Sequence, residues 1–217
     1  MLLSRKPTKK EVVTAFRTRE IIAAARKLME ERGLEAVTME EIAGAAGVAK
    51  GTIYLYFPSK DELIQALITQ VGESLLQEIE AAVTGAGSAP EKIQRVATLL
   101  LRCLTQARAL YPIYARDSHR ARQSPSPGYL RQIQEREEKF FDLVTPVFAQ
   151  GIAAGQFIPA NPRLLTFMFR GLVRSVGYYQ MSGGQEEVVK EALPVLLTLL
   201  SSGLTPKSPQ AAEVTHP

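Results

Sequence analysis

The sequence predicts an all-α protein with an N-terminal three-helix helix-turn-helix domain followed by a C-terminal helical bundle. Three observations indicate this fold class. Two short helical patterns meet at a glycine turn between Thr38 and Phe57, apolar residues recur at helical spacing after residue 91, and no stretch alternates apolar and polar residues as a half-buried strand would. A chain of 217 residues can form one large domain or two small ones.

The first predicted element is a helix that ends at Gly33, where a chain leaving a helix often needs a positive φ. Residues 1–13, which precede it, are expected to form a flexible basic arm. Thr8 and Glu11 have the spacing of a capping box, so the helix can also begin there instead of near residues 14–18.

The next two elements are short helices. Thr38 and Glu41 form a capping box that starts the first of them. Gly47 permits the turn, and a second helix then runs from Ala49 to about residue 55. Two helices joined by such a glycine turn form the helix-turn-helix unit, whose second helix enters the DNA major groove. We assign three residues to its core: Ile53, Leu55 and Phe57.

A fourth helix, about residues 59–83, connects the two predicted domains, which are residues 14–60 and 61–204. Ser59 and Glu62 form a further capping box at its start.

The rest of the chain follows the Gly-rich break TGAGSAP. Five further segments have helical spacing: 91–110, 113–122, 129–154, 161–181 and 186–202. Pro194 should bend the last of these helices. Residues 205–217 are predicted to be a disordered tail.

Charge is unevenly distributed along the chain. Residues 1–60 hold 11 lysines and arginines against 7 aspartates and glutamates, and the remainder holds 15 of each, so the whole net charge of +4 lies in the N-terminal segment. This balance suits a partner with a phosphate backbone, although unpaired lysines can also simply solvate a mobile N-terminus.

The single cysteine, Cys103, excludes an internal disulfide and fits a reducing compartment. We interpret it as a small buried hydrophobe, with a redox sensor as the alternative. No apolar run of about 18 residues and no secretory signal is present, so we expect a cytoplasmic protein without a membrane partner.

The segment Val37–Leu67, VTMEEIAGAAGVAKGTIYLYFPSKDELIQAL, resembles the tetracycline-repressor (TetR) family of bacterial regulators. The preceding segment Arg19–Gly33, REIIAAARKLMEERG, resembles the family's first helix with its glycine stop. The resemblance implies a ligand-responsive transcriptional regulator, most often a repressor. Such a protein binds a palindromic operator on double-stranded DNA as a homodimer and is released by a small organic effector.

Side chains of the second short helix suit DNA recognition. Lys50 can donate to a phosphate or a guanine edge, Thr52 can contact a thymine methyl, and Gly51 permits close backbone approach. Two of the residues in the resembling segment, Tyr54 and Tyr56, can alternatively be partly core aromatics. The complete predicted DNA-binding set is Thr38, Ala49, Lys50, Gly51, Thr52, Tyr54, Tyr56 and Lys60.

The last two predicted helices are apolar over more than one face, so each must bury more than one side. The resemblance implies that this pair forms a four-helix dimer bundle, and the alternative is a monomer with an internal helix pair. The predicted dimer interface is Leu165, Phe169, Leu172, Val176, Val189, Leu193, Leu196, Leu197 and Leu200.

A ligand cavity is expected between facing helices of the bundle, and its effector should be largely apolar. Plain core packing is the alternative for each candidate. Arg170 and His119 are further polar candidates. The predicted lining is Leu104, Tyr111, Tyr114, Phe140, Phe141, Phe167, Met168, Arg174 and Tyr178. The resemblance implies that a shift of the fourth helix changes the spacing of the two recognition helices.

Two other classes compete with a regulator. An enzyme is disfavoured because the chain has only two histidines and no Ser/His/Asp, Cys/His or HExxH set, and we expect no cofactor and no metal. A DNA-binding architectural protein without an effector is the alternative function.

Overall fold

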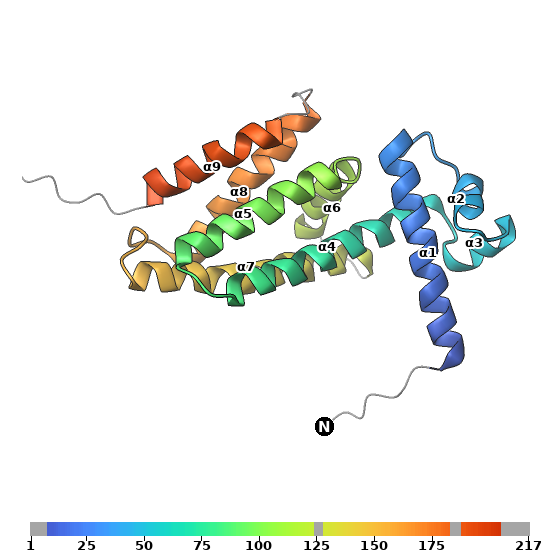
Figure 1. The fold of residues 1–217 in the computed structure, drawn as a ribbon, viewed down its shortest axis with the longest axis horizontal. Helices are drawn as coiled ribbons and strands as arrows, with labels where there is room; N and C mark the ends of the chain where they lie inside the picture. The colour runs from blue at the N-terminus through green and yellow to red at the C-terminus, as the bar shows by residue number, and fades with distance from the viewer. Residues whose placement is uncertain (1–7, 124–127, 183–187, 205–217) are drawn as a thin grey trace, which may run out of the picture.

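The computed structural model describes residues 8–123, 128–182 and 188–204, and these residues form nine α-helices and no strand (Figure 1). The predicted all-α class, with an N-terminal helix-turn-helix and a C-terminal bundle, is confirmed. The N-terminal helices are α1 (Lys9–Arg32), α2 (Met39–Ala45) and α3 (Lys50–Tyr56), followed by α4 (Lys60–Thr84). The remaining helices are α5 (Ala89–Gln106), α6 (Tyr111–Gln123), α7 (Tyr129–Ala153), α8 (Pro162–Met181) and α9 (Val188–Leu204).

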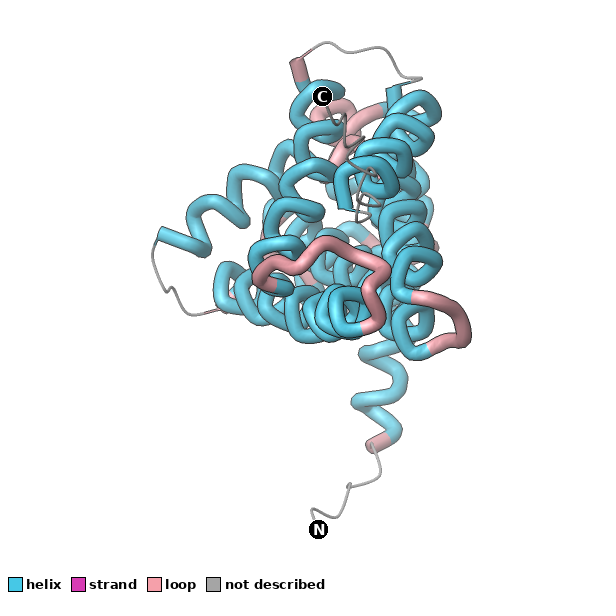
Figure 2. The backbone as a smooth tube through the Cα atoms, turned by 90° about the vertical axis from the view of Figure 1, so that its left-hand side faces the viewer, coloured by secondary structure: helices cyan, strands magenta, loops and turns pink. Residues whose placement is uncertain are grey.

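Helix α4 joins the two parts of the molecule. It leaves the N-terminal unit beside α1 and runs into the bundle, where it packs against α5 and α7. Helices α8 and α9 lie on the side of the bundle opposite α4, and loops join the helices in sequence from α1 to α6 and from α7 to α8 (Figure 2). No described helix has the length and apolarity needed to cross a bilayer.

The predicted flexible arm, residues 1–13, is too long. Helix α1 begins at Lys9, because Thr8 and Glu11 form a complete capping box in which the Thr8 N–H donates to Glu11 Oε2 at 2.6 Å. Residues 9–13 are therefore helical. Residues 1–7 and the predicted tail, 205–217, lie outside the described residues.

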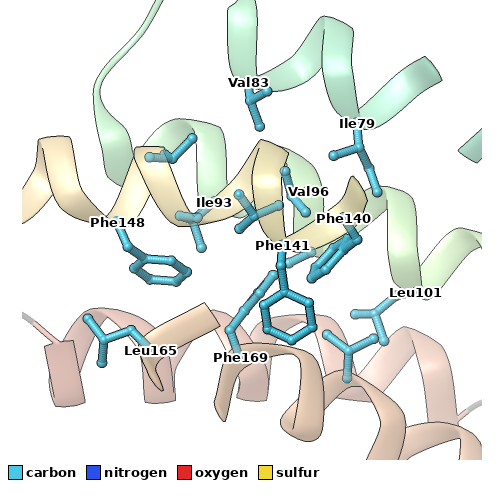
Figure 3. Packing of buried hydrophobic residues seen from close by; sticks show 14 of the residues in the cluster. Ile79, Val83, Ile93, Val96, Leu101, Phe140, Phe141, Phe148, Leu165 and Phe169 are labelled. Carbon is cyan, nitrogen blue, oxygen red and sulfur yellow. The ribbon is translucent and has the colours of Figure 1, made fainter. Parts of the chain in front are cut away.

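Two hydrophobic cores hold the fold together. The N-terminal core is built around Ile21, Ile42 and Ile53, which have no exposed surface. The bundle core is built around Phe148 and Phe169, whose rings meet edge to face with their centroids 6.0 Å apart (Figure 3). Burial of each such side chain contributes about 1.5–3 kcal/mol.

Helix α4 contributes to both cores. Its first half buries Leu63 and Leu67 in the N-terminal core, and its second half buries Leu76, Ile79 and Val83 in the bundle core. A displacement of α4 in the bundle must therefore alter packing in the helix-turn-helix unit.

Gly151 in α7 permits a close approach of the Phe157 ring in the bundle core. A Cβ placed on it would lie 2.3 Å from Cδ2 of Phe157, whereas a Cβ on Gly44 of α2 would meet nothing within 4 Å. Gly151→Ala should lower the free energy of unfolding by about 1–3 kcal/mol because the Phe157 ring has to move. Gly44→Ala is the control, and it should raise that free energy by up to about 1 kcal/mol because alanine favours helix. Chemical denaturation of the two variants checks both values, and equal effects would contradict the assigned packing.

Candidate nucleic-acid interface and effector chamber

The helix-turn-helix unit is fixed by polar contacts at its first turn. The Thr38 N–H donates to Glu41 Oε2 at 2.8 Å, and Arg32 at the end of α1 donates to Glu41 Oε1 at 2.7 Å. Hydrogen bonds from Thr38 and Arg32 lower the pKa of Glu41 to about 2. The carboxylate is therefore ionised at neutral pH, and it ties the end of α1 to the start of α2.

The turn between α2 and α3 requires a glycine. Gly47 has φ 65°, and the following Val48 N–H donates to the Ala43 carbonyl at 2.9 Å. This conformation is accessible to glycine at little cost. The turn sets the direction of α3 because Val48 can then pack partly against the N-terminal core.

Helix α3 is anchored by Ile53 and Phe57 and exposes its other side. Lys50 and Tyr54, one turn apart, are both exposed. The assignment of Leu55 to the core is wrong, because its side chain is 83% exposed. Residue 55 lies about 200° around the helix from Ile53, so it must point away from the core.

The remaining predicted DNA-binding residues differ in how far their side chains are exposed to solvent. Thr38, Ala49 and Gly51 are exposed, whereas Thr52 and Lys60 are partly buried. Tyr56 is also partly buried and packs against the N-terminal core, in agreement with the alternative interpretation of this tyrosine.

Lys50 has a carboxylate partner within the helix-turn-helix unit. Its Nζ lies 2.6 Å from Oε1 of Glu40 on α2, and both side chains are largely exposed. The pair raises the pKa of Lys50 and lowers that of Glu40. A DNA phosphate that binds Lys50 must compete with this carboxylate.

An apolar chamber of about 140 Å³ lies where α4 passes through the bundle. Helix α4 alone contributes six lining residues: Ile68, Val71, Gly72, Leu75, Leu76 and Ile79. Three predicted lining residues, Tyr111, Tyr114 and Phe140, do line this chamber.

The other predicted lining residues do not line this chamber. Leu104 is packed in the bundle core, and Met168 and Tyr178 are exposed on α8. Phe141, Phe167 and Arg174 instead line a neighbouring basin. Residues on α8 follow one another at about 100° around the helix, so an apolar pattern alone does not fix which of them face inward.

The neighbouring basin, of about 310 Å³, lies between α6, α7 and α8 and is strongly basic. It is lined by four arginines and two glutamates: Arg122, Arg163, Arg170, Arg174, Glu137 and Glu138. Arg170 and Glu137 line both this arginine basin and the apolar chamber, so their side chains separate the two.

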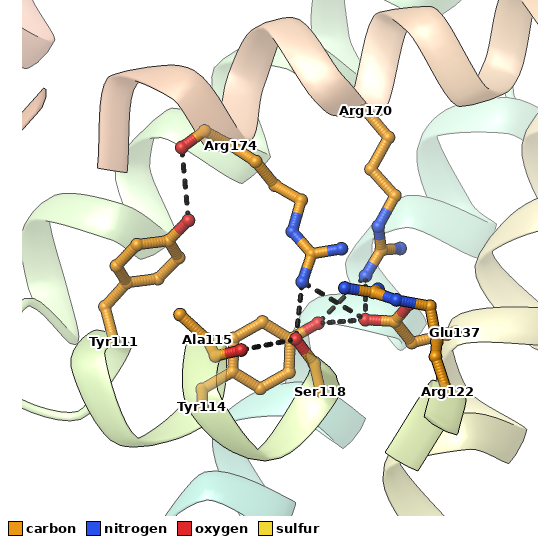
Figure 4. Close-up of polar contacts among 8 residues, drawn as sticks. All are labelled: Tyr111, Tyr114, Ala115, Ser118, Arg122, Glu137, Arg170 and Arg174. Carbon is orange, nitrogen blue, oxygen red and sulfur yellow. Dashed lines mark hydrogen bonds and ion pairs between the residues drawn. The ribbon is translucent and has the colours of Figure 1, made fainter. Parts of the chain in front are cut away.

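A polar network centred on Glu137 forms this separating wall (Figure 4). Glu137 Oε1 accepts from Arg170 at 2.7 Å and from the Tyr114 hydroxyl at 2.9 Å, and its Oε2 accepts from Arg122 at 3.2 Å. Arg174 lies farther from Oε1, at 3.8 Å, and donates to the Ser118 hydroxyl. Burial raises the pKa of Tyr114, so its hydroxyl remains a donor at neutral pH.

Two donors in the chamber wall lack partners. Arg136 Nη2 and Arg170 Nε are buried and make no hydrogen bond. Sequence reasoning missed Arg136 and Glu137 because both lie in the run of charged residues 135–139, EREEK, which has the pattern of a solvent-exposed helix face.

The predicted dimer interface requires correction. Leu165, Phe169 and Leu196 are buried in the bundle core of the same chain and cannot meet a partner. Four others pack partly against that core: Val176, Leu193, Leu197 and Leu200. Val189 lies outside the residues whose side chains are described. Only Leu172 is exposed, and it belongs to a different apolar stripe, the exposed face Leu164, Phe167, Met168, Leu172, Tyr179, Val195 and Leu199.

Cys103 lines the chamber and is partly buried. Burial raises the pKa of its thiol to about 11, which supports a small hydrophobe rather than a redox sensor.

Alkylation of Cys103 in the folded protein should therefore keep accelerating as pH rises beyond 9.0, the ordinary pKa of a cysteine thiol, because thiolate is the reactive form. Mass spectrometry of iodoacetamide labelling checks this, with the urea-unfolded chain as control. A plateau at the same pH in both states would contradict the assigned burial.

Comparison with known proteins supports this geometry. Residues 21–67 match the family described as bacterial regulatory proteins, tetR family. The HTH-type transcriptional repressor KstR2 of Mycobacterium tuberculosis is 27% identical over 140 residues, which cover 64% of this chain and 68% of that protein.

Two solved structures share the fold. A transcriptional regulator of the TetR/AcrR family from Thermobifida fusca has a TM-score of 0.69 and 24% identity, covering 83% of this chain and 96% of its own. AibR, solved with isovaleryl coenzyme A and operator DNA, has a TM-score of 0.62 and 21% identity. The match covers 84% of this chain and 97% of the AibR chain. The matching family and the repressor KstR2 are regulators, which confirms a regulator rather than an enzyme. The helix-turn-helix part of the chain, residues 21–67, therefore matches the TetR family of bacterial regulatory proteins.

Proposed function

We propose that this regulator represses transcription by binding a palindromic operator as a homodimer, and that a small, largely apolar effector releases it. The observation that supports this most is the double placement of α4. One end of the helix is buried in the helix-turn-helix core, and the other end forms a wall of the apolar chamber. An architectural DNA-binding protein without an effector would have no use for such a chamber.

The proposed DNA-contacting surface is the exposed side of α3 with the residues at its edges. Lys50 and Tyr54 supply donors for phosphates, and Thr52 can reach base edges. Leu55 is added to the predicted set, because an exposed aliphatic side chain beside them suits contact with a thymine methyl.

The proposed dimer forms through the exposed apolar face of α8 and α9 defined above. Seven large apolar side chains gathered on two adjacent helices are more than a monomer usually leaves exposed. In such a dimer, two copies of α3 that enter successive major grooves on one side of a duplex lie about 34–36 Å apart.

The proposed effector acts through α4. A molecule in the chamber touches several turns of this helix and favours the α4 position that accommodates it. It releases DNA only to the extent that it binds that position more tightly than the DNA-bound one. AibR, a protein of this fold solved with isovaleryl coenzyme A and operator DNA, supports an effector of this general kind.

Substitutions in α3 test the DNA surface. Lys50→Ala and Tyr54→Phe should each weaken binding to an operator selected from a random duplex library, Lys50→Ala by about tenfold, and Lys50→Ala should also reduce the salt dependence of binding. Glu40→Gln is the matched variant, and it should strengthen binding because Lys50 loses its competing carboxylate. Fluorescence anisotropy at several salt concentrations checks all three. Unchanged affinity in Lys50→Ala and Tyr54→Phe would overturn the choice of α3 as the reading helix.

A charge on the exposed apolar face tests the dimer. Leu172→Glu should raise the dimer dissociation constant at least about tenfold, because the unpaired carboxylate would be buried between protomers. Gln94→Glu, at an exposed position of α5, is the control and should leave the assembly unchanged. Sedimentation velocity across a concentration series distinguishes them. A Leu172→Glu protein that remains dimeric at every concentration would rule out this face.

A further inference from the structure

The arginine basin holds more positive charge than its own carboxylates neutralise. Glu137 alone pairs with Arg122, Arg170 and Arg174, at 3.2, 2.7 and 3.8 Å. Arg170 and Glu137 are only 13% and 12% exposed, so water does little to screen this imbalance. The fourth arginine of the basin, Arg163, pairs with Glu138 at 2.7 Å on the rim.

Arg136 adds a further positive charge on the chamber side. It makes no ion pair among the described residues, and its Nη2 is one of the buried donors without a partner. Burial lowers the pKa of Arg136, as expected for a guanidinium that lacks a carboxylate. Buried donors are nearly always satisfied in native proteins, so these orphaned donors indicate a missing acceptor.

The two compartments differ in size as well as in polarity. The apolar chamber measures about 140 Å³, and the arginine basin measures about 310 Å³. An apolar cavity of about 150 Å³ holds one benzene molecule in another protein. The chamber therefore has room for a single ring or a short acyl chain, and the rest of a larger molecule would have to extend into the basin.

We propose that the effector is an amphipathic anion whose short apolar group fills the chamber and whose carboxylate or phosphate head lies in the arginine basin. The assignment rests on the proposed effector-dependent function and names the chemical class of that effector. Arg170 and Glu137 (Figure 4) form the wall between the compartments. At this wall the apolar group of the effector would join its anionic head.

An anion fits this wall better than a neutral or cationic molecule. Its head replaces Glu137 as the partner of Arg170 and offers an acceptor to the unpaired Nε. A neutral apolar molecule would leave the Nε of Arg170 unpaired, and a cation would meet four arginines against two glutamates in the basin.

The same contact reaches α4. A Cβ on Gly72 would lie 3.1 Å from Nε of Arg136, so the Arg136 side chain rests directly on the α4 backbone. A ligand acceptor that draws Arg136 towards the chamber changes this contact. Occupation of the chamber and displacement of α4 are thereby linked through Arg136, while the anionic head itself lies in the basin against Arg170.

Six-carbon probes of different charge test the assignment. Isothermal titration should detect binding of hexanoate and hexanoyl coenzyme A, with hexan-1-ol, hexan-1-amine and free coenzyme A at least about tenfold weaker. Whichever anionic probe binds more tightly identifies the head as carboxylate or phosphate-bearing. Equal or tighter binding of the alcohol or the amine would overturn the proposal. So would the absence of binding by both anions while the protein still binds its operator, and that result would leave the DNA-binding function standing.

Matched variants locate the site. Binding of the anionic probe should be weakened by Arg170→Met and Arg136→Met, each by about tenfold, and also by the rim variant Arg163→Met. Arg131→Met, an exposed arginine of the same helix as Arg136, should not. Arg163 is more than half exposed, so its replacement tests the basin even if a buried variant fails to fold.

A second pair tests the chamber. Leu100→Trp should block binding because Leu100 lines the chamber, whereas Leu99→Trp should bind normally because Leu99 does not. Equal affinities in both pairs of variants would overturn the site. Binding with the expected variant pattern but without operator release would uphold the ligand assignment and overturn the release mechanism.

Discussion

Burial of one helix in two separate hydrophobic cores is the constraint on which the rest of the structure depends. Leu63 and Leu67 hold the first half of α4 among α1, α2 and α3, and Ile79 holds the second half among α5 and α7. Because protein interiors are close-packed, neither half can move without repacking its own core. The helix therefore connects the packing of the two cores, and under the proposed mechanism the position of α3 follows from what fills the chamber beside α4.

Features that depend on nearby residues were predictable from the sequence. The capping pairs at Thr38 and Ser59 mark the starts of α2 and α4, because the contacts involved span three residues, whereas the pair at Thr8 was only the alternative start of α1 and proved to be the correct one. The glycine turn at Gly47 was also predictable from the sequence. These local rules define the helix-turn-helix completely enough to identify its class, and the family comparison agrees.

Features that depend on how a helix is rotated about its axis were not predictable. Leu55 on α3 and Leu165 on α8 are both apolar, yet the first is exposed and the second is buried. An apolar residue satisfies the pattern in either position, and only the packing of distant elements decides between them. The Glu137 network was missed for the same reason, since it joins residues of α6, α7 and α8 that are far apart in the chain.

The contact between Lys50 and Glu40 has a consequence for how the protein finds its target. Every duplex in the cell offers phosphates, so a basic helix with no internal partner would spend most of its time on irrelevant DNA. An acidic neighbour 2.6 Å away imposes the same energetic threshold on all of them. Only a DNA sequence that supplies additional base contacts would offset the free energy of breaking the Lys50–Glu40 pair. In the proposed complex with DNA, Glu40 would thus shorten the residence time at non-specific sites and also weaken binding to the operator somewhat.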